Sequence, residues 1–356
     1  MGVIMGKLRI ATIGTGIVVD WFLDAVSQTE GVEFVGAYSR SLDKARSWGE
    51  PRGAKLFFDD LNALASCPDI DAVYIASPNA LHIPNAKVLL AAGKHVLAEK
   101  ALASNAREAA EAFALAHERG VVLMEAMRNV HGPVFEAIRG ALPQLGEVRS
   151  ATFRFSKVSS RVPALMAGQL TNTFSPKMAG GGLMDIGVYC VSAMTDLWGA
   201  PKRVAAMGTT FDVSTIGGDE RWPIVELGGE ALCDYGDFVV NLSWGKVGDN
   251  HVPSQIMGTE ATLVIDSIST PQRVEVVRPA QTEGGYGSGA GEATLLGFPM
   301  DGSLMTSEIA DFCEACSGSA EGRAIAQRFE RTSLDALAVM DQIREQIGTR
   351  FPADEA

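Results

Sequence analysis

In the first third of the chain, apolar residues form short, nearly unbroken runs that alternate with longer stretches of helical spacing. Five such runs, rich in β-branched residues, lie between Lys7 and Met124. Strands of this kind are typical of a parallel sheet that helices cover on both faces. The pattern predicts strands at 8–13, 32–38, 72–75, 95–97 and 121–124, and helices at 18–29, 41–49, 79–92 and 104–119.

After about Gly146 the period of the pattern shortens to two residues, as in strands with one buried face. Short turn signals, such as Tyr235-Gly236-Asp237, separate the later runs and favour an antiparallel arrangement. The glycine-rich stretch 281–293 is expected to form a mobile loop, and 303–348 to be helical. The pattern predicts strands from 148 onward and at 204–210, 230–235, 238–244, 254–258, 262–266 and 273–277.

The fold class that these patterns predict is α/β, with two domains. Residues 1–126 would form a doubly wound parallel sheet. Residues 127–356 would form an α+β domain with a large open, mostly antiparallel sheet, and its C-terminal helix could pack back on the first domain.

Charge and cysteine content exclude several classes of partner. The 356 residues include 43 acidic and 30 basic side chains, for a formal net charge of −13. Such a surface repels phosphate backbones and anionic lipid, so neither nucleic acid nor a membrane is expected as a partner. Five cysteines, an odd number, fit reduced thiols in the cytoplasm. Cys313 and Cys316 have metal or redox spacing, but no second pair or histidine follows, so no metal is expected.

A glycine turn connects the first predicted strand to the first predicted helix. In Gly14-Thr15-Gly16, the first glycine allows a tight turn and the second lets the backbone approach a pyrophosphate. That group would rest on the helix N-terminus at Ile17 and Val18. Val19 stands where a small residue is usual, so the motif alone equally fits an ordinary strand–helix turn. Its place at the first strand of a βαβ series favours a Rossmann dinucleotide-binding domain.

The end of the second predicted strand bears on the choice of cofactor. An Asp or Glu there would accept a hydrogen bond from the ribose 2′-hydroxyl of NAD. The strand instead ends at Ser39-Arg40, with Lys44 one helical turn further on. These donors suit the 2′-phosphate of NADP, which is therefore the expected cofactor, with NAD as an alternative. An exposed arginine at a strand end is the other interpretation.

Two further segments carry candidate catalytic groups. Lys100 follows an apolar strand, at the sheet edge where ligands of doubly wound folds bind, and it could donate to a substrate oxygen or shuttle a proton. In the segment from Gly180 to Tyr189, three glycines permit close ligand approach and Asp185 is spaced i, i+4 from Tyr189 on one helix face. Tyr189 could act as general acid/base beside a cation such as Lys100, with Asp185 accepting a substrate hydroxyl. Ordinary roles, a surface Glu–Lys pair and a half-buried core tyrosine, are the alternatives.

Taken together, these motifs resemble the glucose-fructose oxidoreductase / inositol dehydrogenase / MocA-type family over nearly the whole chain. The resemblance implies an NAD(P)-dependent oxidoreductase acting on sugars, polyols or related diols, and a homodimer formed through the open sheet. The family's Glu-Lys-Pro motif corresponds to Glu99-Lys100-Ala101, where the proline that can hold a cis bond is missing. Tyr189 stands where many members carry His, as in the trans-dihydrodiol and NADP-dependent xylose dehydrogenase branch. The resemblance also places Ser77, Pro78, Asn79 and His82 near the nicotinamide, together with Glu99 and Lys100.

The expected reaction moves a hydride between the nicotinamide and a substrate carbinol, while Tyr189 or Lys100 exchanges the hydroxyl proton. Arg128, Asn129 and His131 follow the last strand of the first domain and are equally well interpreted as substrate contacts or as a linker. A non-catalytic NADP-binding sensor and a cofactor-assisted hydrolysis or elimination remain as alternative functions. The substrate itself is not predicted.

Overall fold

The computed structural model describes residues 6–280, 290–296, 303 and 305–355, and these form two compact units. The first contains the described residues up to Met127 together with those from 303 to Leu337. The second contains Arg128 to residue 296 together with Ala338–Glu355. The long helix α10 (Ala320–Ile347) contributes residues to both units.

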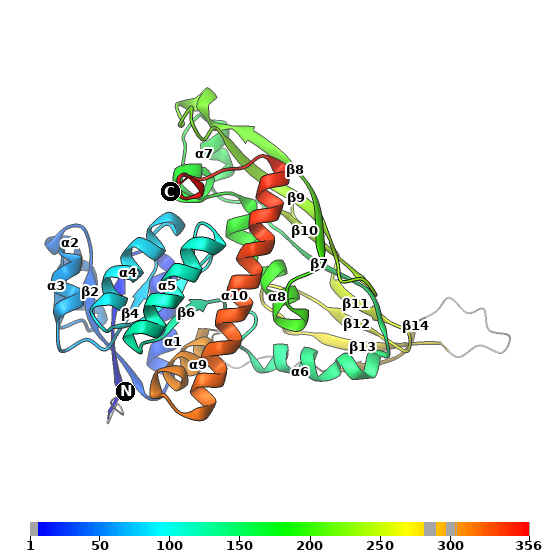
Figure 1. Cartoon of the computed structure of the whole chain (residues 1–356), viewed down its shortest axis with the longest axis horizontal. Coiled ribbons are helices and arrows are strands. Elements are labelled where there is room, and N and C mark those ends of the chain that lie inside the picture. The colour runs from blue at the N-terminus through cyan, green and yellow to red at the C-terminus, as the bar shows by residue number, and fades with distance from the viewer. Residues whose placement is uncertain (1–5, 281–289, 297–302, 304, 356) are drawn as a thin grey trace. The chain divides into compact units, whose positions relative to one another are not determined.

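The first unit is built on a six-stranded sheet whose neighbouring strands are all parallel (Figure 1). The order β3-β2-β1-β4-β5-β6 has its reversal between β1 and β4, the topology of a doubly wound fold. The predicted parallel sheet is thereby confirmed. Its strands are β1 (Leu8–Ile13), β2 (Val32–Tyr38), β3 (Leu56–Phe58), β4 (Ala72–Ile75), β5 (His95–Glu99) and β6 (Leu123–Ala126).

Helices pack against this sheet and close its core. Buried side chains such as Ile75, Val96, Leu89 and Phe113 belong to one apolar cluster. The predicted helices are present within a few residues at their ends, but the pattern missed β3 and α3, which have only three and six residues. The helices of this unit are α1 (Ile17–Gln28), α2 (Leu42–Gly49), α3 (Leu61–Ser66), α4 (His82–Ala91), α5 (Ala106–Arg119) and α9 (Met305–Ser317).

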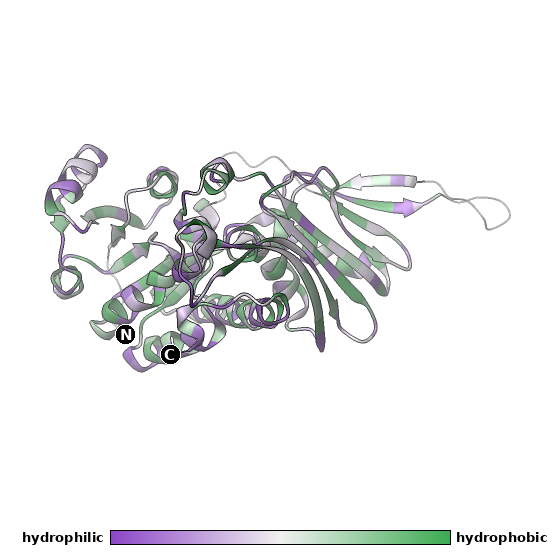
Figure 2. Cartoon of the chain, turned by 90° about the horizontal axis from the view of Figure 1, so that it is seen from above, coloured by the Kyte–Doolittle hydropathy of each residue, from purple (hydrophilic) through white to green (hydrophobic). Residues whose placement is uncertain are grey.

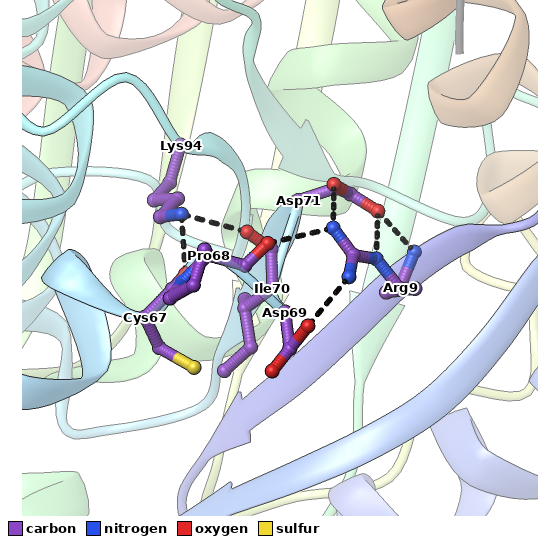
Figure 3. Close-up of polar contacts among 7 residues, drawn as sticks. All are labelled: Arg9, Cys67, Pro68, Asp69, Ile70, Asp71 and Lys94. Carbon is purple, nitrogen blue, oxygen red and sulfur yellow. Dashed lines mark hydrogen bonds and ion pairs between the residues drawn. The ribbon is translucent and has the colours of Figure 1, made fainter. Parts of the chain in front are cut away.

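A polar network at the amino ends of β1 and β4 fixes the chain between α3 and β4 (Figure 3). The Arg9 guanidinium donates to both carboxylate oxygens of Asp71, at 2.9 and 2.8 Å. The Lys94 ammonium donates to the carbonyl oxygens of Cys67 and Ile70, both at 2.7 Å. The carboxyl ends of the same strands carry the predicted cofactor residues. The network therefore stabilises the edge of the sheet opposite the candidate site.

The second unit is built on an eight-stranded sheet of order β14-β13-β12-β11-β7-β10-β9-β8. Only β7 and β10 run parallel to each other, and the other neighbouring pairs are antiparallel. The predicted open, mostly antiparallel sheet is confirmed. Its strands are β7 (Val148–Ser156), β8 (Arg203–Asp212), β9 (Ile224–Asp234), β10 (Val239–Gly245), β11 (Ser254–Gly258), β12 (Thr262–Ile265), β13 (Val274–Pro279) and β14 (Ala290–Leu295).

One face of this sheet is buried and the other is open. Helix α8 (Val188–Trp198) packs on β7 and β10, and α6 (Pro133–Ala141) packs on β13. Hydrophobic and hydrophilic residues are interleaved along these strands (Figure 2). On the open face Met207 is 83% exposed and Leu232 is 52% exposed.

The prediction of a loop over 281–293 is wrong for its last residues, because 290–295 form β14 and pair with β13. Residues 281–289 lie outside the described residues. Glycines surround β14 in the sequence and hide its strand pattern. The strand forms because β13 provides its hydrogen-bond partners, and the local sequence does not predict this pairing.

Candidate active site

The glycine turn after β1 has the conformation that a dinucleotide site needs. Gly14 has φ +119°, and a Cβ there would lie 2.7 Å from the carbonyl oxygen of Ala76, so only glycine fits. Gly16 precedes α1, and no atom lies within 4 Å of where its Cβ would be. Space above the helix N-terminus is therefore open. Val19 is fully buried in the core, so its size does not fill that space.

The chain after β2 presents cations beside this turn. Tyr38 pairs with Ile13, so the ends of β1 and β2 are neighbours. Ser41 caps α2 through its hydroxyl, which accepts from the N–H of Lys44 at 3.4 Å. The side chains of Arg40 and Lys44 are exposed, as a contact to a 2′-phosphate would require.

His82 connects the two loops that follow β4 and β5. Its Nδ1 lies 2.9 Å from the carbonyl oxygen of Ala101, and its Nε2 lies 2.7 Å from that of Ser77. Burial lowers the pKa of this histidine, whereas its hydrogen bonds to the two carbonyl oxygens favour the charged ring. Although it begins helix α4, His82 is fully buried and not on the helix surface. His82 holds the Ser77-Pro78-Asn79 loop to the segment that follows Lys100, and its contact with a cofactor stays a prediction.

Carboxylates from two strands fix the backbone around Lys100. Glu99 ends β5, and its carboxylate accepts from the Tyr74 hydroxyl at 2.5 Å and from the Lys100 N–H at 3.3 Å. Glu125 on β6 accepts from the Leu102 N–H at 2.9 Å. The peptide bond between Lys100 and the following alanine is cis, although proline is absent there. Glu99 thus contacts the backbone of Lys100, and its predicted cofactor contact stays a prediction.

The glycines of the 180–189 segment accommodate the protein itself. A Cβ on Gly180 would lie 2.6 Å from the carbonyl oxygens of Asn172 and Thr173. Gly181 has φ +134°, and its Cβ would lie 2.5 Å from Oε2 of Glu226. The interpretation of these glycines as room for a ligand is therefore unnecessary, because protein atoms already occupy the positions that side chains would take.

The predicted α-helical relation between Asp185 and Tyr189 is wrong. Leu183–Gly187 form a π-helical turn, and α8 begins only at Val188. π-helical turns are rare in proteins, and those that occur are often located at functional sites. Asp185 forms an ion pair with Lys246, whose side chain is 7% exposed against 36% for the aspartate.

Tyr189 lies in an aromatic and cationic environment within the second unit. The Arg128 guanidinium carbon is 5.5 Å from the centre of its ring, and Phe155 meets the ring edge-to-face at 5.7 Å. The side-chain amide of Asn129 donates to the carbonyl oxygens of Tyr189 at 3.1 Å and of Ile268 at 3.0 Å. Asn129 thus fixes the start of α8 from within the protein. Substrate contacts by Arg128, Asn129 and His131 stay predictions.

Sequence reasoning missed two buried charged residues of this unit, Glu226 and Lys246. A signal for Lys246 was present, since it continues the inward-facing alternation of Val240, Leu242 and Trp244. A lysine in a core register is unusual and indicates a specific partner. Glu226 had no such signal, because a bulge in β9 changes which residues face inward.

Metal and membrane roles gain no support from the described part of the chain. There, no three His, Cys, Asp or Glu residues are grouped to bind a metal ion. Burial raises the pKa of Cys313 to about 11, which disfavours the thiolate that a ligand or redox role needs. None of the described helices is both long and apolar enough to span a membrane.

Comparison with known proteins defines the class. Residues 8–127 match the oxidoreductase family with an NAD-binding Rossmann fold, and residues 142–264 match the GFO/IDH/MocA C-terminal domain. The chain belongs to this GFO/IDH/MocA family of oxidoreductases, as the two motifs in its halves had indicated.

Individual relatives match either nearly the whole chain or about half of it. The scyllo-inositol 2-dehydrogenase (NADP(+)) IolU of Bacillus subtilis is 36% identical over 98% of this chain and 100% of its own length. The trans-1,2-dihydrobenzene-1,2-diol dehydrogenase of Mus musculus is 32% identical over 56% of this chain and 60% of its own length. A 3-ketoreductase from Actinomadura kijaniata, solved with NADP and TDP-benzene, has a TM-score of 0.79 at 25% identity and covers 96% of this chain and 98% of its own.

Proposed function

We propose that this protein is an NADP-dependent dehydrogenase that oxidises a ring carbinol of a cyclic polyol or sugar, and reduces the corresponding ketone in reverse. The observation that carries the proposal is the full-length similarity to an NADP-dependent inositol dehydrogenase. The similar diol dehydrogenase is named for a vicinal diol on a six-membered ring, which supports a vicinal-diol substrate class, and the similar ketoreductase supports the reverse reduction of a ketone.

Cofactor binding is assigned to the carboxyl edge of the parallel sheet. The backbone from Gly14 to Val18 would receive the pyrophosphate at the N-terminus of α1. Arg40, Ser39 and Lys44 would donate to the 2′-phosphate, because guanidinium and ammonium groups make charge-assisted hydrogen bonds to phosphate oxygens. When bound, the nicotinamide accepts or supplies the hydride.

Proton transfer is assigned to Lys100 and Tyr189. During oxidation the substrate loses a hydride from the carbinol carbon, and its hydroxyl proton passes to Tyr189 or Lys100. Asp185 would accept a hydrogen bond from a neighbouring substrate hydroxyl, which orients the ring. Residues of the loop after β7 and the Arg128–His131 segment would contact the remaining hydroxyls.

The test is a substrate panel of inositols, aldoses and cyclic diols, scanned with NADP and NAD side by side. Formation of NADPH with at least one cyclic polyol supports the proposal. Tight NADP binding without turnover of any panel member would indicate a sensor instead. Product without net NADPH would indicate elimination or hydrolysis. The variant Lys100→Met should lose about 10³-fold in kcat while keeping its affinity for NADP.

We also propose a cytoplasmic homodimer that pairs the open faces of two eight-stranded sheets. Met207, Leu232 and Val239 place apolar area on that face, with exposed fractions of 83, 52 and 40%. Apolar patches of this kind mark contact surfaces. Light scattering should give twice the chain mass, and Leu232→Glu should yield monomers; a wild-type monomer would refute the dimer.

A further inference from the structure

Two charged side chains of the larger sheet contact the turn that carries Asp185 and leads to Tyr189. Glu226 lies on β9, and Lys246 follows β10. Their residues are only 2% and 6% exposed. Charged groups so deeply buried are costly unless they are paired and hydrogen-bonded. Each of them has such a partner in the turn.

Glu226 fixes where the turn begins. Its carboxylate accepts from the backbone N–H groups of Gly182 and Leu183 and from the indole N–H of Trp244, the last at 2.8 Å. The first N–H groups of a helical turn have no partner within the turn, so a carboxylate placed there fixes both its start and its rotation. Gly181 and Gly182 allow the approach, because a Cβ on either would lie within 2.9 Å of a Glu226 oxygen.

A β-bulge directs Glu226 to this position. Thr209 pairs with Gly228, whereas Thr210 pairs with Glu226, so Leu227 is an extra residue in β9. If β9 kept all its residues but had no bulge, the alternation through Cys233, Ala231 and Gly229 would direct Leu227 inward and Glu226 outward. Bulges re-aim side chains in this way beside active sites.

Lys246 fixes Asp185 from the opposite end of the turn. Its ammonium forms an ion pair with the Asp185 carboxylate from the buried side. The aspartate side chain stays 36% exposed, so it can still reach a small molecule. The two contacts act on the same five-residue π-helical turn, one on its backbone and one on its side chain.

We propose that Glu226 and Lys246 are positioning residues that together hold the 182–187 turn in the arrangement in which Asp185 and Tyr189 act on substrate. Glu226 sets the path of the backbone into α8, and Lys246 sets the direction of the Asp185 carboxylate. Neither needs to touch the substrate. The inference rests on the proposed function through the roles assigned to Asp185 and Tyr189.

Steady-state kinetics on the full chain test the proposal, with scyllo-inositol or the best panel substrate and NADP. Glu226→Gln keeps the size of the side chain but leaves one acceptor oxygen for three donors, and should lower kcat by about 10²-fold. Lys246→Met should raise KM for the polyol at least tenfold, and Lys246→Arg should recover most of that loss. The affinity for NADP should stay within twofold in all three variants, which also verifies that the first unit is folded.

Matched controls use exposed residues of the second unit. Glu147→Gln removes a carboxylate paired with Arg149, and Lys177→Met removes a lysine paired with Asp219. Both should leave kcat and KM unchanged. Variants of Glu226 and Lys246 that behave like these controls would overturn the proposal, as would equal losses in Lys246→Met and Lys246→Arg with no change in KM.

Hydrogen exchange separates the failure of this inference from the failure of the proposed function. Amides of residues 179–190 should exchange at least tenfold faster in Glu226→Gln than in wild type, whether or not any substrate is turned over. If exchange is faster in the variant but the chain oxidises no panel member, the proposed dehydrogenase activity is refuted and the positioning role of Glu226 is supported. Unchanged exchange would refute the positioning role of Glu226 directly.

Discussion

Glu226 should make the stability of the second unit depend on pH, and Glu226→Gln should remove that dependence. Burial raises the pKa of this carboxyl from 4.5 to about 7, against the three hydrogen bonds that favour its charged form. Between these two values the folded protein holds a proton that the unfolded chain releases. The contribution to stability is therefore complete below pH 4.5 and is lost as the pH rises through 7.

The size of the effect follows from the shift. A difference of about 2.5 pKa units, at ~1.36 kcal/mol per unit, corresponds to about 3 kcal/mol between pH 4.5 and pH 8. Other groups titrate in this range too, so the informative quantity is the difference between wild type and Glu226→Gln at each pH. That difference should favour wild type by roughly 2 to 3 kcal/mol more at pH 5 than at pH 8.

Urea-dependent hydrogen exchange of α8 peptides measures this quantity, because those peptides report the second unit alone. Runs at pH 5, 6, 7 and 8 with wild type, Glu226→Gln and the exposed control Glu147→Gln give the comparison. The free energy of unfolding of the control should equal that of wild type at every pH. The assigned titration would be refuted if the difference in free energy of unfolding between wild type and Glu226→Gln stayed constant across the four pH values.

Three further outcomes are expected. Arg40→Ala should weaken NADP binding by about 10- to 100-fold and NAD binding by less than twofold, since only NADP has the 2′-phosphate; equal losses in fluorescence titrations would contradict this. Gly14→Ala should abolish cofactor binding, because its Cβ would lie 2.7 Å from a backbone carbonyl at φ +119°, whereas Gly248→Ala, with open space around it, should not. Asp71→Asn should destabilise the first unit by about 1 kcal/mol at pH 7. Burial would raise the Asp71 pKa, but the Arg9 hydrogen bonds hold it below 3.8, so the deficit should shrink as pH falls below that value in urea melts.

The sequence was sufficient to predict both sheets. Fully buried runs such as Val73 to Ile75 are typical of a covered parallel strand, and binding of the cofactor at the carboxyl ends of these strands stays a prediction. Short elements with half-buried residues, such as Leu56–Phe58, left no readable period. Tertiary pairing decided them.

The candidate site was predicted less completely than the fold. Sequence motifs identified Lys100, Asp185 and Tyr189 as candidates. The motifs did not identify Glu226 and Lys246, because their positions depend on backbone geometry. The π-helical turn changes the spacing that an α-helix would give, and the bulge at Leu227 changes the parity of β9. Neither is encoded by residue type alone. The alternation of buried residues in β10 would have predicted that Lys246 is buried, if it had been extended one residue beyond the end of the strand.

The bulge at Leu227 makes the geometry of the glycine segment sensitive to the pairing register of β9. If Leu227 paired with Thr210 in regular alternation, the outer part of β9 would stay paired as before, but the Glu226 carboxylate would turn to the other face of the sheet and Leu227 would take its place. A chain paired in that register would fold around a segment that has lost its acceptor for two backbone amides. Engineered exchanges of substrate units between relatives therefore have to conserve the bulge in this strand, and not only its hydrophobic character.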